Sequence, residues 1–294
     1  MHKAVLELGA ARRAARRFVA GEDLSDAMAA VRDLNARGMT ASLDHLGEKV
    51  SDLPSAAAAA ADYRGILDGI ARQHVEGNIS LKLTQLGLDV DPAACAQFLR
   101  EIVGAARGDG NFVRIDMESS ACVDRTLALY RGLRGEGFDN VGIVLQSYLY
   151  RTARDLEELL PLHPSVRLVK GAYAEPAEIA YPRKADVDAS FRRLAERVLD
   201  AAPYPAIATH DEALIEHTKT HAAARGIPAD RFEFQMLYGI RRDLQEQIVR
   251  QRYRMRVYVP FGRQWFPYFM RRLAERPANV GFVLRNLIAE RGGG

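Results

Sequence analysis

The amino-acid sequence predicts a single (β/α)8 barrel of the TIM type, and two observations point to this fold class. Eight short runs of β-branched or apolar residues recur at intervals of roughly 25–40 residues, and a longer helical pattern follows most of them. No linker or break in composition divides the 294 residues. We therefore expect one domain, with N-terminal helices in residues 1–39, the barrel strands in residues 40–262 and C-terminal helices in residues 263–294.

The strands are predicted from apolar runs that end at Gly, Pro or polar residues. They are expected at Thr40–His45, Asn78–Leu86, Phe112–Ser119, Val141–Leu149, Val166–Tyr173, Ala206–Asp211, Phe232–Leu237 and Met255–Gly262. The helices have apolar residues at helical spacing, and one opens with Asp91-Pro92, a frequent helix start. They are expected at Glu22–Met39, Ser55–Ala71, Asp91–Ala106, Thr126–Arg134, Thr152–Leu160, Val187–Ala201, Asp211–Arg225 and Arg241–Gln251, with a further helix around Leu287.

The composition is that of an ordinary globular protein. The net charge of +3 is too small to indicate nucleic-acid binding, and no block of like charges forms a binding stripe. Cys95 and Cys122 lack metal-ligand spacing and fit a reducing compartment, so we expect a cytoplasmic protein. No apolar run reaches the roughly 18 residues of a transmembrane helix. Four arginines near the N-terminus are typical of the solvated face of a first helix, with a transit peptide or a membrane-surface helix as alternatives: Arg12, Arg13, Arg16 and Arg17.

Polar side chains alternate with apolar ones in several predicted strands. Both faces of a barrel strand are buried, so a charged residue there is costly unless it is paired. Lys82, Asp116, Gln146 and Glu233 are expected toward the C-terminal ends of their strands, which is where barrel enzymes place their active sites. The alternative is an internal ion-pair plug without chemistry, such as Lys82 with Asp116.

The last predicted strand leads into an aromatic helix that carries two arginines. Tyr268 shares a face of this helix with Arg271 and Arg272, at i+3 and i+4. Two guanidinium groups beside a phenol can bind a carboxylate or a phosphate. The alternative is an exposed basic turn in which Glu275 pairs with Arg271.

Several common motifs are absent from the sequence. There is no GxGxxG and no P-loop, so a nucleotide cofactor is not expected in a Rossmann crevice. GxSxG and HExxH are absent too, and His45, His163 and His210 form no recognisable cluster, so we expect no metal.

Taken in order along the chain, the polar strand ends resemble those of the proline dehydrogenase family, whose members are flavin-dependent (β/α)8 barrels. The resemblance runs from about residue 40 to about residue 285, and its specificity comes from the combined set of segments. The segments are Leu43–Glu48, Ser80–Gln85, Arg114–Glu118, Val144–Leu149, Arg167–Tyr173, Ala208–His210, Phe232–Gly239, Tyr258–Gly262 and Tyr268–Asn279.

The resemblance implies that L-proline is oxidised to Δ1-pyrroline-5-carboxylate, the first step of proline catabolism to glutamate. Arg271 and Arg272 match the pair that binds the proline carboxylate, with Lys82 as a third cation. Tyr258 matches a residue that crowds carbon 4 of the ring, which favours proline over hydroxyproline. The same resemblance places Leu237 and Tyr268 at the substrate pocket, Asp116 beside the cations, and Glu48 as a gate carboxylate that pairs with Arg271.

The resemblance also implies FAD as the cofactor and a quinone as the electron acceptor. Arg167 would stabilise negative charge on the reduced flavin, which with Asp116 makes it a candidate catalytic residue. The cofactor contacts that the resemblance implies are Gln146, Arg167, Val169, Lys170, Gly171, Tyr173, Thr209, His210 and Glu233.

The sequence also departs from the family pattern. Asp211 stands where the family often has Asn, and Ala174 where a bulky aromatic is common. The chain has no room for the aldehyde dehydrogenase and DNA-binding regions of bifunctional relatives, so we expect a separate pyrroline-5-carboxylate dehydrogenase and no nucleic-acid partner. Peripheral contact with the inner face of the membrane fits a quinone acceptor. The alternatives are a folate-reductase-like flavin barrel that uses NAD(P)H, a non-catalytic flavin-binding protein, and a membrane adaptor that binds through the N-terminal arginines.

Overall fold

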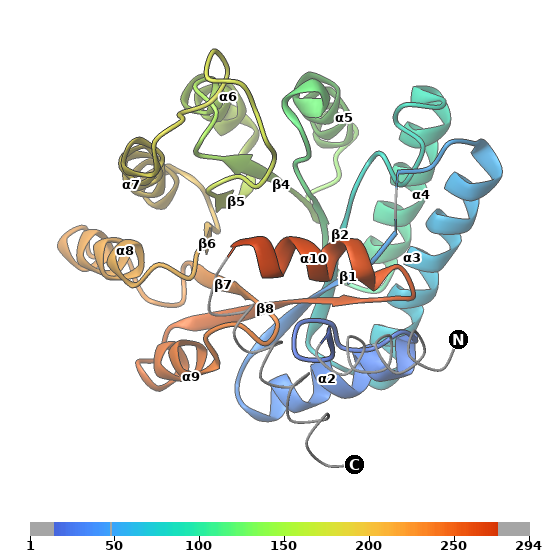
Figure 1. Cartoon of the computed structure of the whole chain (residues 1–294), viewed down its shortest axis with the longest axis horizontal. Coiled ribbons are helices and arrows are strands. Elements are labelled where there is room, and N and C mark those ends of the chain that lie inside the picture. The colour runs from blue at the N-terminus through green and yellow to red at the C-terminus, as the bar shows by residue number, and fades with distance from the viewer. Residues whose placement is uncertain (1–14, 48, 276–294) are drawn as a thin grey trace, which may run out of the picture.

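The computed structural model describes residues 15–47 and 49–275, and its strands form a closed parallel barrel with helices outside (Figure 1). This confirms the predicted fold class. The strands are β1 (Thr40–His45), β2 (Gly77–Leu81), β3 (Val113–Ile115), β4 (Val141–Gln146), β5 (Ser165–Val169), β6 (Ala206–Ala208), β7 (Glu233–Leu237) and β8 (Arg254–Phe261). Each strand pairs with the next, and β1 closes the barrel against β8 with Ser42 opposite Tyr258.

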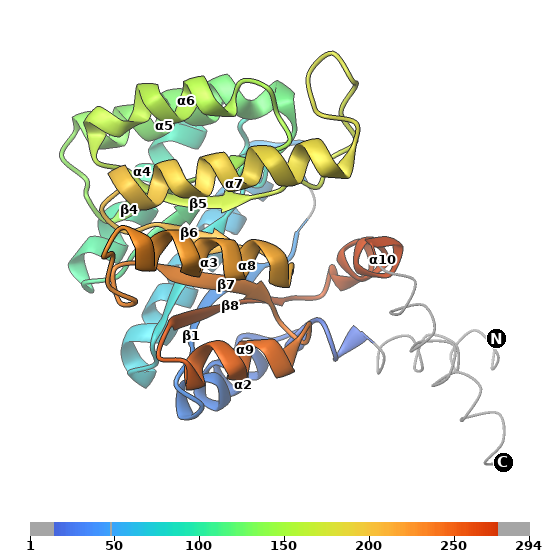
Figure 2. The same cartoon turned by 90° about the vertical axis from the view of Figure 1, so that its left-hand side faces the viewer.

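Helices cover the outside of the barrel, as Figures 1 and 2 show. They are α3 (Leu53–Gln73), α4 (Pro92–Gly108), α5 (Val123–Gly135), α6 (Thr152–Leu159), α7 (Lys184–Ala201), α8 (Glu212–Ala224) and α9 (Arg242–Arg250), with short 3-10 turns at Ser120–Cys122 and Leu160–Leu162. The eighth outer place, beside β8 and β1, is taken by α2 (Leu24–Ala36), which precedes the first strand. The helix that follows β8, α10 (Trp265–Glu275), lies beyond the strand ends instead (Figure 2).

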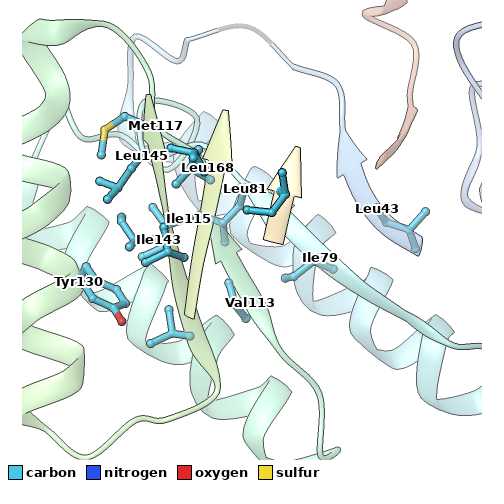
Figure 3. Close-up of a cluster of buried hydrophobic side chains, with 14 of the residues drawn as sticks. Leu43, Ile79, Leu81, Val113, Ile115, Met117, Tyr130, Ile143, Leu145 and Leu168 are labelled. Atoms are coloured by element: carbon cyan, nitrogen blue, oxygen red, sulfur yellow. The ribbon is translucent and has the colours of Figure 1, made fainter. Parts of the chain in front are cut away.

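The main core lies between the strands and the outer helices. Leu43, Ile79, Ile115 and Leu168 are fully buried strand residues in one hydrophobic cluster with helix residues such as Tyr130 (Figure 3). Alternate residues of the same strands, among them Ser42, Ser80 and Arg114, are buried and polar. Because side chains of a strand alternate between its two faces, the apolar set packs outward and the polar set lies in the lumen.

Most strands are shorter than the sequence predicts at their C-terminal ends. The second predicted strand continues to Leu86, whereas β2 ends at Leu81. Beyond it the apolar residues Leu83 and Leu86 are still buried, but the backbone turns, with the amide of Leu86 donating to the carbonyl of Leu83. Buried loops with apolar side chains have the same sequence signature as buried strands, which is why the predicted ends were wrong.

Helix starts follow their capping residues. Asp91 accepts hydrogen bonds from the amides of Ala93 and Ala94, as its Asp-Pro sequence suggested, and Asp52 and Asp211 cap α3 and α8 in the same way. The helix expected around Leu287, and Arg12 and Arg13, lie outside the described residues. Within residues 15–47 and 49–275 no helix is both long and apolar enough to cross a bilayer.

Candidate active site

A cavity of about 590 Å³ opens at the C-terminal end of the barrel, next to α10. Its lining combines residues that are far apart in the sequence and come from strand ends, the loops after them and α10. Nearly all of the predicted site residues line it: Lys82, Asp116, Gln146, Arg167, Val169, Lys170, Gly171, Tyr173, Thr209, His210, Leu237, Tyr258, Tyr268, Arg271 and Arg272.

A cluster of two carboxylates and two cations forms the floor of the cavity. Lys82 Nζ donates to Asp44 Oδ1 at 2.9 Å and lies 3.5 Å from Asp116 Oδ2. Arg167 donates to Asp116 Oδ1 at 2.7 Å, and the hydroxyl of Tyr258 donates to Asp116 Oδ2 at 2.7 Å. We call Asp44, Lys82, Asp116, Arg167 and Tyr258 the upper cluster. Each buried charge in it has an opposite charge within hydrogen-bonding distance, as burial requires.

Two serines of the lumen fix the position of Arg167. This side chain rises from the middle of β5 and is 4% exposed. Its guanidinium donates to Ser80 Oγ at 3.0 Å and to Ser42 Oγ at 3.3 Å, in addition to Asp116. Ser80 itself donates to Asp116 Oδ1 at 2.7 Å. Small hydroxyl residues on β1 and β2 therefore leave room for a guanidinium and satisfy two of its nitrogens.

The charges of the upper cluster support one another. Burial alone would lower the pKa of Lys82, but the carboxylates of Asp44 and Asp116 outweigh it and raise this pKa. Burial would likewise raise the pKa of Asp116, but Lys82 and Arg167 outweigh it and lower that pKa. Burial and the neighbouring Asp116 raise the pKa of Tyr258 well above its usual range. Lys82 and Asp116 are therefore charged and Tyr258 is a neutral donor across the physiological pH range.

Helix α10 brings two further cations to the cavity. It packs through Trp265, Tyr268 and Phe269, which join a small hydrophobic cluster with Phe18 and Ile240. This i, i+3, i+4 stripe places the next residues of the helix over the cavity. Arg272 is 9% exposed with its guanidinium 5.0 Å from the centre of the Tyr268 ring, and the more exposed Arg271 lies 6.0 Å from the same ring. The predicted face of Tyr268, Arg271 and Arg272 is thus formed.

Lys170 and its neighbours form the opposite rim of the cavity. Lys170 Nζ lies 2.5 Å from Asp188 Oδ1 and 3.0 Å from Asp211 Oδ2. Asp211, the departure noted in the sequence, caps α8 and also lies 3.4 Å from Lys184 Nζ. In this structure the carboxylate at position 211 therefore holds the rim lysines as well as the start of a helix.

Local structure accounts for Gly171 and His210, two further predicted residues of the rim. Gly171 has a φ of +114°, which favours glycine, and a Cβ there would lie 2.2 Å from the ring of Tyr148. His210 Nε2 accepts a hydrogen bond from the amide of Leu237 at 3.0 Å, which ties the loop after β6 to the end of β7.

Two buried polar atoms next to the cavity have no partner among the described residues. Gln146 donates through its amide nitrogen to the carbonyls of Met117 and Glu118, but its Oε1 accepts no hydrogen bond. Arg167 Nε is also buried without an acceptor. Buried polar atoms are rarely left unsatisfied, so a donor and an acceptor of a bound molecule fit this side of the cavity. A flavin ring edge, which carries both, is compatible with these residues.

The comparison with known families decides which enzymes this site belongs with. The family model described as "Proline dehydrogenase" matches residues 27–285. The chain belongs to the proline dehydrogenase family.

The relatives agree with this assignment. Proline dehydrogenase 1 of Bacillus subtilis strain 168 is 44% identical over 274 residues, which cover 93% of this chain and 90% of that protein. Proline dehydrogenase of Deinococcus radiodurans is 45% identical over 278 residues, again 93% of this chain and 90% of that protein. Among solved structures, proline utilization A (PutA) from Bdellovibrio bacteriovorus, inactivated by N-propargylglycine, has a TM-score of 0.84 at 27% identity. That match covers 89% of this chain and 32% of the PutA chain.

One predicted residue of this family site does not line the cavity. Glu233 was expected toward the C-terminal end of its strand, but it is the first residue of β7 and lies at the opposite end of the lumen, so that placement was wrong. There it pairs with Arg256 Nε at 2.8 Å. The predicted strand began at Phe232, one residue before β7, and its sequence did not indicate which of its polar residues faced the cavity. Glu48, the expected gate, lies outside the described residues.

The sequence reasoning missed Asp44 as a site residue. It is 1% exposed, lines the cavity and is the nearer carboxylate partner of Lys82. A signal was available, because Ser42 and Asp44 alternate with the apolar Ala41 and Leu43 in the first strand. This is the same departure from an apolar strand that drew attention to Lys82 and Asp116.

Proposed function

We infer that this protein is a proline dehydrogenase that oxidises L-proline to Δ1-pyrroline-5-carboxylate. The observation that carries this inference is the convergence of Lys82, Arg271 and Arg272 on one cavity in a chain of this family. These cations come from opposite ends of the barrel sequence, and three of them suit one small carboxylate.

The substrate carboxylate would be held by Arg271, Arg272 and Lys82. Lys82 also donates to Tyr258 at 3.3 Å, so the phenol is close to the cation that orients the substrate. Binding through one carboxylate fixes the position of the pyrrolidine ring relative to the rest of the cavity, which lowers the entropy cost of reaching the reactive geometry. Leu237, Tyr258 and Tyr268 line the same cavity and would form the apolar wall for the ring.

The charge balance near the clamp favours the neutral amine of proline. Four cations, Lys82, Arg167, Arg271 and Arg272, face two carboxylates, Asp44 and Asp116. An excess of positive charge disfavours an ammonium group, so a bound proline loses its amine proton more readily than in water. Oxidation to an imine requires that free lone pair on nitrogen. The cluster thus assists deprotonation without a dedicated general base.

We propose FAD as the cofactor. Gln146, Arg167, Lys170, Gly171, Thr209 and His210 would hold it, and the unsatisfied Gln146 Oε1 and Arg167 Nε fit its ring. When bound, the flavin would accept the hydride from C5 of proline. The buried charge of Arg167 would favour the anionic reduced ring.

We further propose that a quinone takes the electrons from the reduced protein and that a separate dehydrogenase consumes the product. The alternative, a flavin barrel that reduces folates, predicts NAD(P)H as the reductant instead of proline.

The spectrum of the purified protein tests this function. The protein should be yellow, and L-proline should bleach the flavin band near ~450 nm under anaerobic conditions. Cyclopentanecarboxylate, which keeps the carboxylate and ring but has no amine, should bind without bleaching. A flavin-loaded protein that NADPH bleaches and L-proline does not would sink the assignment.

A further inference from the structure

The ammonium group of Lys82 has three partners within the protein. Nζ lies 2.9 Å from Asp44 Oδ1, 3.3 Å from the hydroxyl of Tyr258 and 3.5 Å from Asp116 Oδ2. A lysine ammonium carries three N–H donors and has no further hydrogen to offer. The carboxylate of a substrate can therefore be bound by Lys82 only when one of these three contacts is exchanged for it.

The contacts to Asp116 and Tyr258 are the ones that Lys82 can give up. Both are longer than the roughly 2.7–2.9 Å that is typical of a hydrogen bond between an ammonium and a carboxylate. Asp116 keeps other donors, because Arg167 and Ser80 each donate to its Oδ1 at 2.7 Å. Its Oδ2 accepts from the hydroxyl of Tyr258, also at 2.7 Å. Turning one Lys82 donor away therefore leaves Asp116 paired.

The contact to Asp44 cannot be given up in the same way. Asp44 is 1% exposed, and Lys82 is the one side chain among the described residues that donates a hydrogen bond to its carboxylate. Loss of that bond would leave a buried carboxylate without a cation, which is strongly destabilising. The distance of 2.9 Å is that of a charge-assisted hydrogen bond. Asp44 and Lys82 therefore stay together while the other partners of Lys82 change.

Asp44 is fixed by the barrel, whereas Lys82 follows the end of a strand. Asp44 lies within β1 and pairs in register with Ser80 of β2. Lys82 is the first residue after β2, where its carbonyl accepts from the amide of Gln85 in a turn. Its side chain is 25% exposed, against 1% for that of Asp44. Asp44 therefore holds the ammonium from the buried side and leaves it access to the cavity that both residues line.

We propose that Asp44 is a positioning residue of the clamp that binds the substrate carboxylate. It holds the Lys82 ammonium while Lys82 turns one donor from Asp116 or Tyr258 to that carboxylate. The proposal rests on the proposed function, because that function supplies the carboxylate. Asp44 acts only through Lys82 and does not touch the substrate. The hydroxyl of Tyr258 still donates to Asp116 after the exchange, so the upper cluster keeps its geometry.

Asp44 also keeps Lys82 protonated. Burial would lower the pKa of Lys82, but the carboxylates around it outweigh burial and raise that pKa, Asp44 more than Asp116. Removal of the Asp44 charge should therefore lower the pKa of Lys82, so that the lysine begins to lose its proton at a lower pH. The other titratable or charged groups around Lys82 are Asp116 and Glu118 from the segment after β3, Tyr258 from β8, Arg167 from β5, Tyr173 from the loop after β5 and Arg271 from α10.

Asp44→Asn tests the proposal in the flavin-loaded protein, because it keeps the shape of the side chain and removes its charge. With a soluble dye as acceptor, KM for L-proline near about pH 7.5 should rise about tenfold while kcat stays within about twofold, since the carboxylate is bound equally in the ground and transition states. The ratio of this KM to that of the unchanged protein should grow as the pH is raised to about 9.5, because Lys82 then loses its proton only in the variant. An unchanged KM at both pH values would overturn the positioning role.

Asp44→Glu separates the position of the charge from its presence. The longer side chain displaces Lys82 but keeps a carboxylate beside it, so KM should rise without the trend in pH. This variant also serves as the test if Asp44→Asn does not fold. A KM equal to that of the unchanged protein would show that the placement of Lys82 by Asp44 is immaterial and would overturn the proposal.

A double-mutant cycle shows whether Asp44 acts through Lys82. Lys82→Met should raise both KM and the Kd of cyclopentanecarboxylate, which is read from the change that this compound causes in the flavin spectrum. Adding Asp44→Asn to Lys82→Met should change either value by less than about twofold, since the group that Asp44 positions is already gone. Losses that add in the double variant would mean that Asp44 acts by another route.

Glu233→Gln is the matched control, because it removes a buried carboxylate that pairs with a cation at the other end of the same lumen. It should leave KM and the Kd of cyclopentanecarboxylate unchanged. A rise equal to that of Asp44→Asn would show that any loss of buried charge has this effect and would overturn the assigned role. Proline turnover that Asp44→Asn leaves unaltered refutes the role of Asp44 alone. If the unchanged protein neither oxidises proline nor binds cyclopentanecarboxylate, the proposed function is refuted, and the clamp with it.

Discussion

The two ends of the barrel lumen both contain buried ions and both border a cavity, but they differ in how those ions are arranged. At the lower end Glu233 Oε1 accepts from Arg256 at 2.8 Å and from Gln235, and Glu233 Oε2 accepts from Tyr204 at 3.1 Å. We call Glu233, Arg256, Gln235 and Tyr204 the lower cluster. At the upper end, Asp44, Lys82, Asp116, Arg167 and Tyr258 face a cavity to which α10 adds two more arginines.

The partners of the charged groups distinguish a structural ion pair from a ligand-binding site. In the lower cluster each oxygen of the carboxylate has a partner within the lumen. Arg114, close by, donates to the carbonyl of Ser165 at 2.5 Å, and burial followed by repulsion from Arg167 lowers its pKa to about 9, so it remains charged at neutral pH. At the upper end Arg271 and Arg272 of α10 join Lys82 and Arg167, so four cations face the carboxylates of Asp44 and Asp116. This excess of positive charge beside the cavity suits an anionic ligand.

The largest expected effect comes from breaking the lower cluster. Glu233→Ala removes the carboxylate that compensates Arg256 and leaves a buried cation unpaired, which costs about 3–5 kcal/mol of unfolding free energy. Urea unfolding monitored by circular dichroism measures this. Because Glu233 is remote from the cavity, the folded fraction should retain its KM for proline. A variant that unfolds normally but binds proline weakly would contradict the structural role.

The upper end of the lumen, where α10 adds Arg272 beside the upper cluster, should respond in the opposite way. Arg272→Ala removes one charged partner of the substrate carboxylate and should raise KM for proline roughly 10–100-fold, since hydrogen bonds to charged groups contribute about 1.5–3 kcal/mol. The flavin absorbance should remain. Arg263→Ala, with an exposed arginine on the turn before the same helix, is the control and should leave KM unchanged with a soluble acceptor. Loss of flavin from the Arg272 variant would move this residue out of the substrate role.

The alternation of polar and apolar residues along the strands predicts part of this difference between the two ends of the lumen. Alternation marks a polar residue that faces the lumen or its mouth, and it correctly singled out Lys82 and Asp116, which line the cavity. It does not say at which end of the lumen a residue lies unless the strand limits are known. Those limits were uncertain because buried loops such as the one containing Leu83 and Leu86 read as strand. This is why Glu233 was assigned to the wrong end and why Asp44, in a correctly predicted strand, went unrecognised without its spatial partner Lys82.

Tyr258 and Tyr204, one in each cluster, allow the loss of a single hydroxyl group to be compared between the two ends of the lumen. The hydroxyls of Tyr258 and Tyr204 each donate to a buried carboxylate, Asp116 at 2.7 Å and Glu233 at 3.1 Å. Tyr258→Phe removes a donor within the upper cluster and should lower kcat/KM about 5–10-fold, with about 1 kcal/mol lost in stability. Tyr204→Phe should cost similar stability and leave kcat/KM unchanged. Equal losses of kcat/KM in both variants would mean that the two ends act as one network.

The smallest expected effect is the response of the two clusters to acid. Burial alone would raise the pKa of Glu233, but Arg256 outweighs it and lowers this pKa, as Lys82 and Arg167 do for Asp116. A carboxyl group whose pKa is lowered by folding contributes stability that is present above its unfolded pKa and is lost as the pH falls through its folded pKa. Each unit of such a shift corresponds to about 1.4 kcal/mol.

The free energy of unfolding, measured with urea from neutral pH down to about pH 3, should therefore decrease once the pH drops below the unfolded pKa of glutamate, roughly 4.3. Glu233→Gln should reduce that fall, because the titrating group of the lower cluster is gone. Glu118 contributes with the opposite sign, since burial raises its pKa and its protonation on acidification favours the folded state. Glu118→Gln should therefore steepen the loss in acid. Parallel pH curves for Glu233→Gln and the unchanged protein would mean that Glu233 is not ionised by its pairing with Arg256, and the lower cluster could not then be described as a closed ion pair.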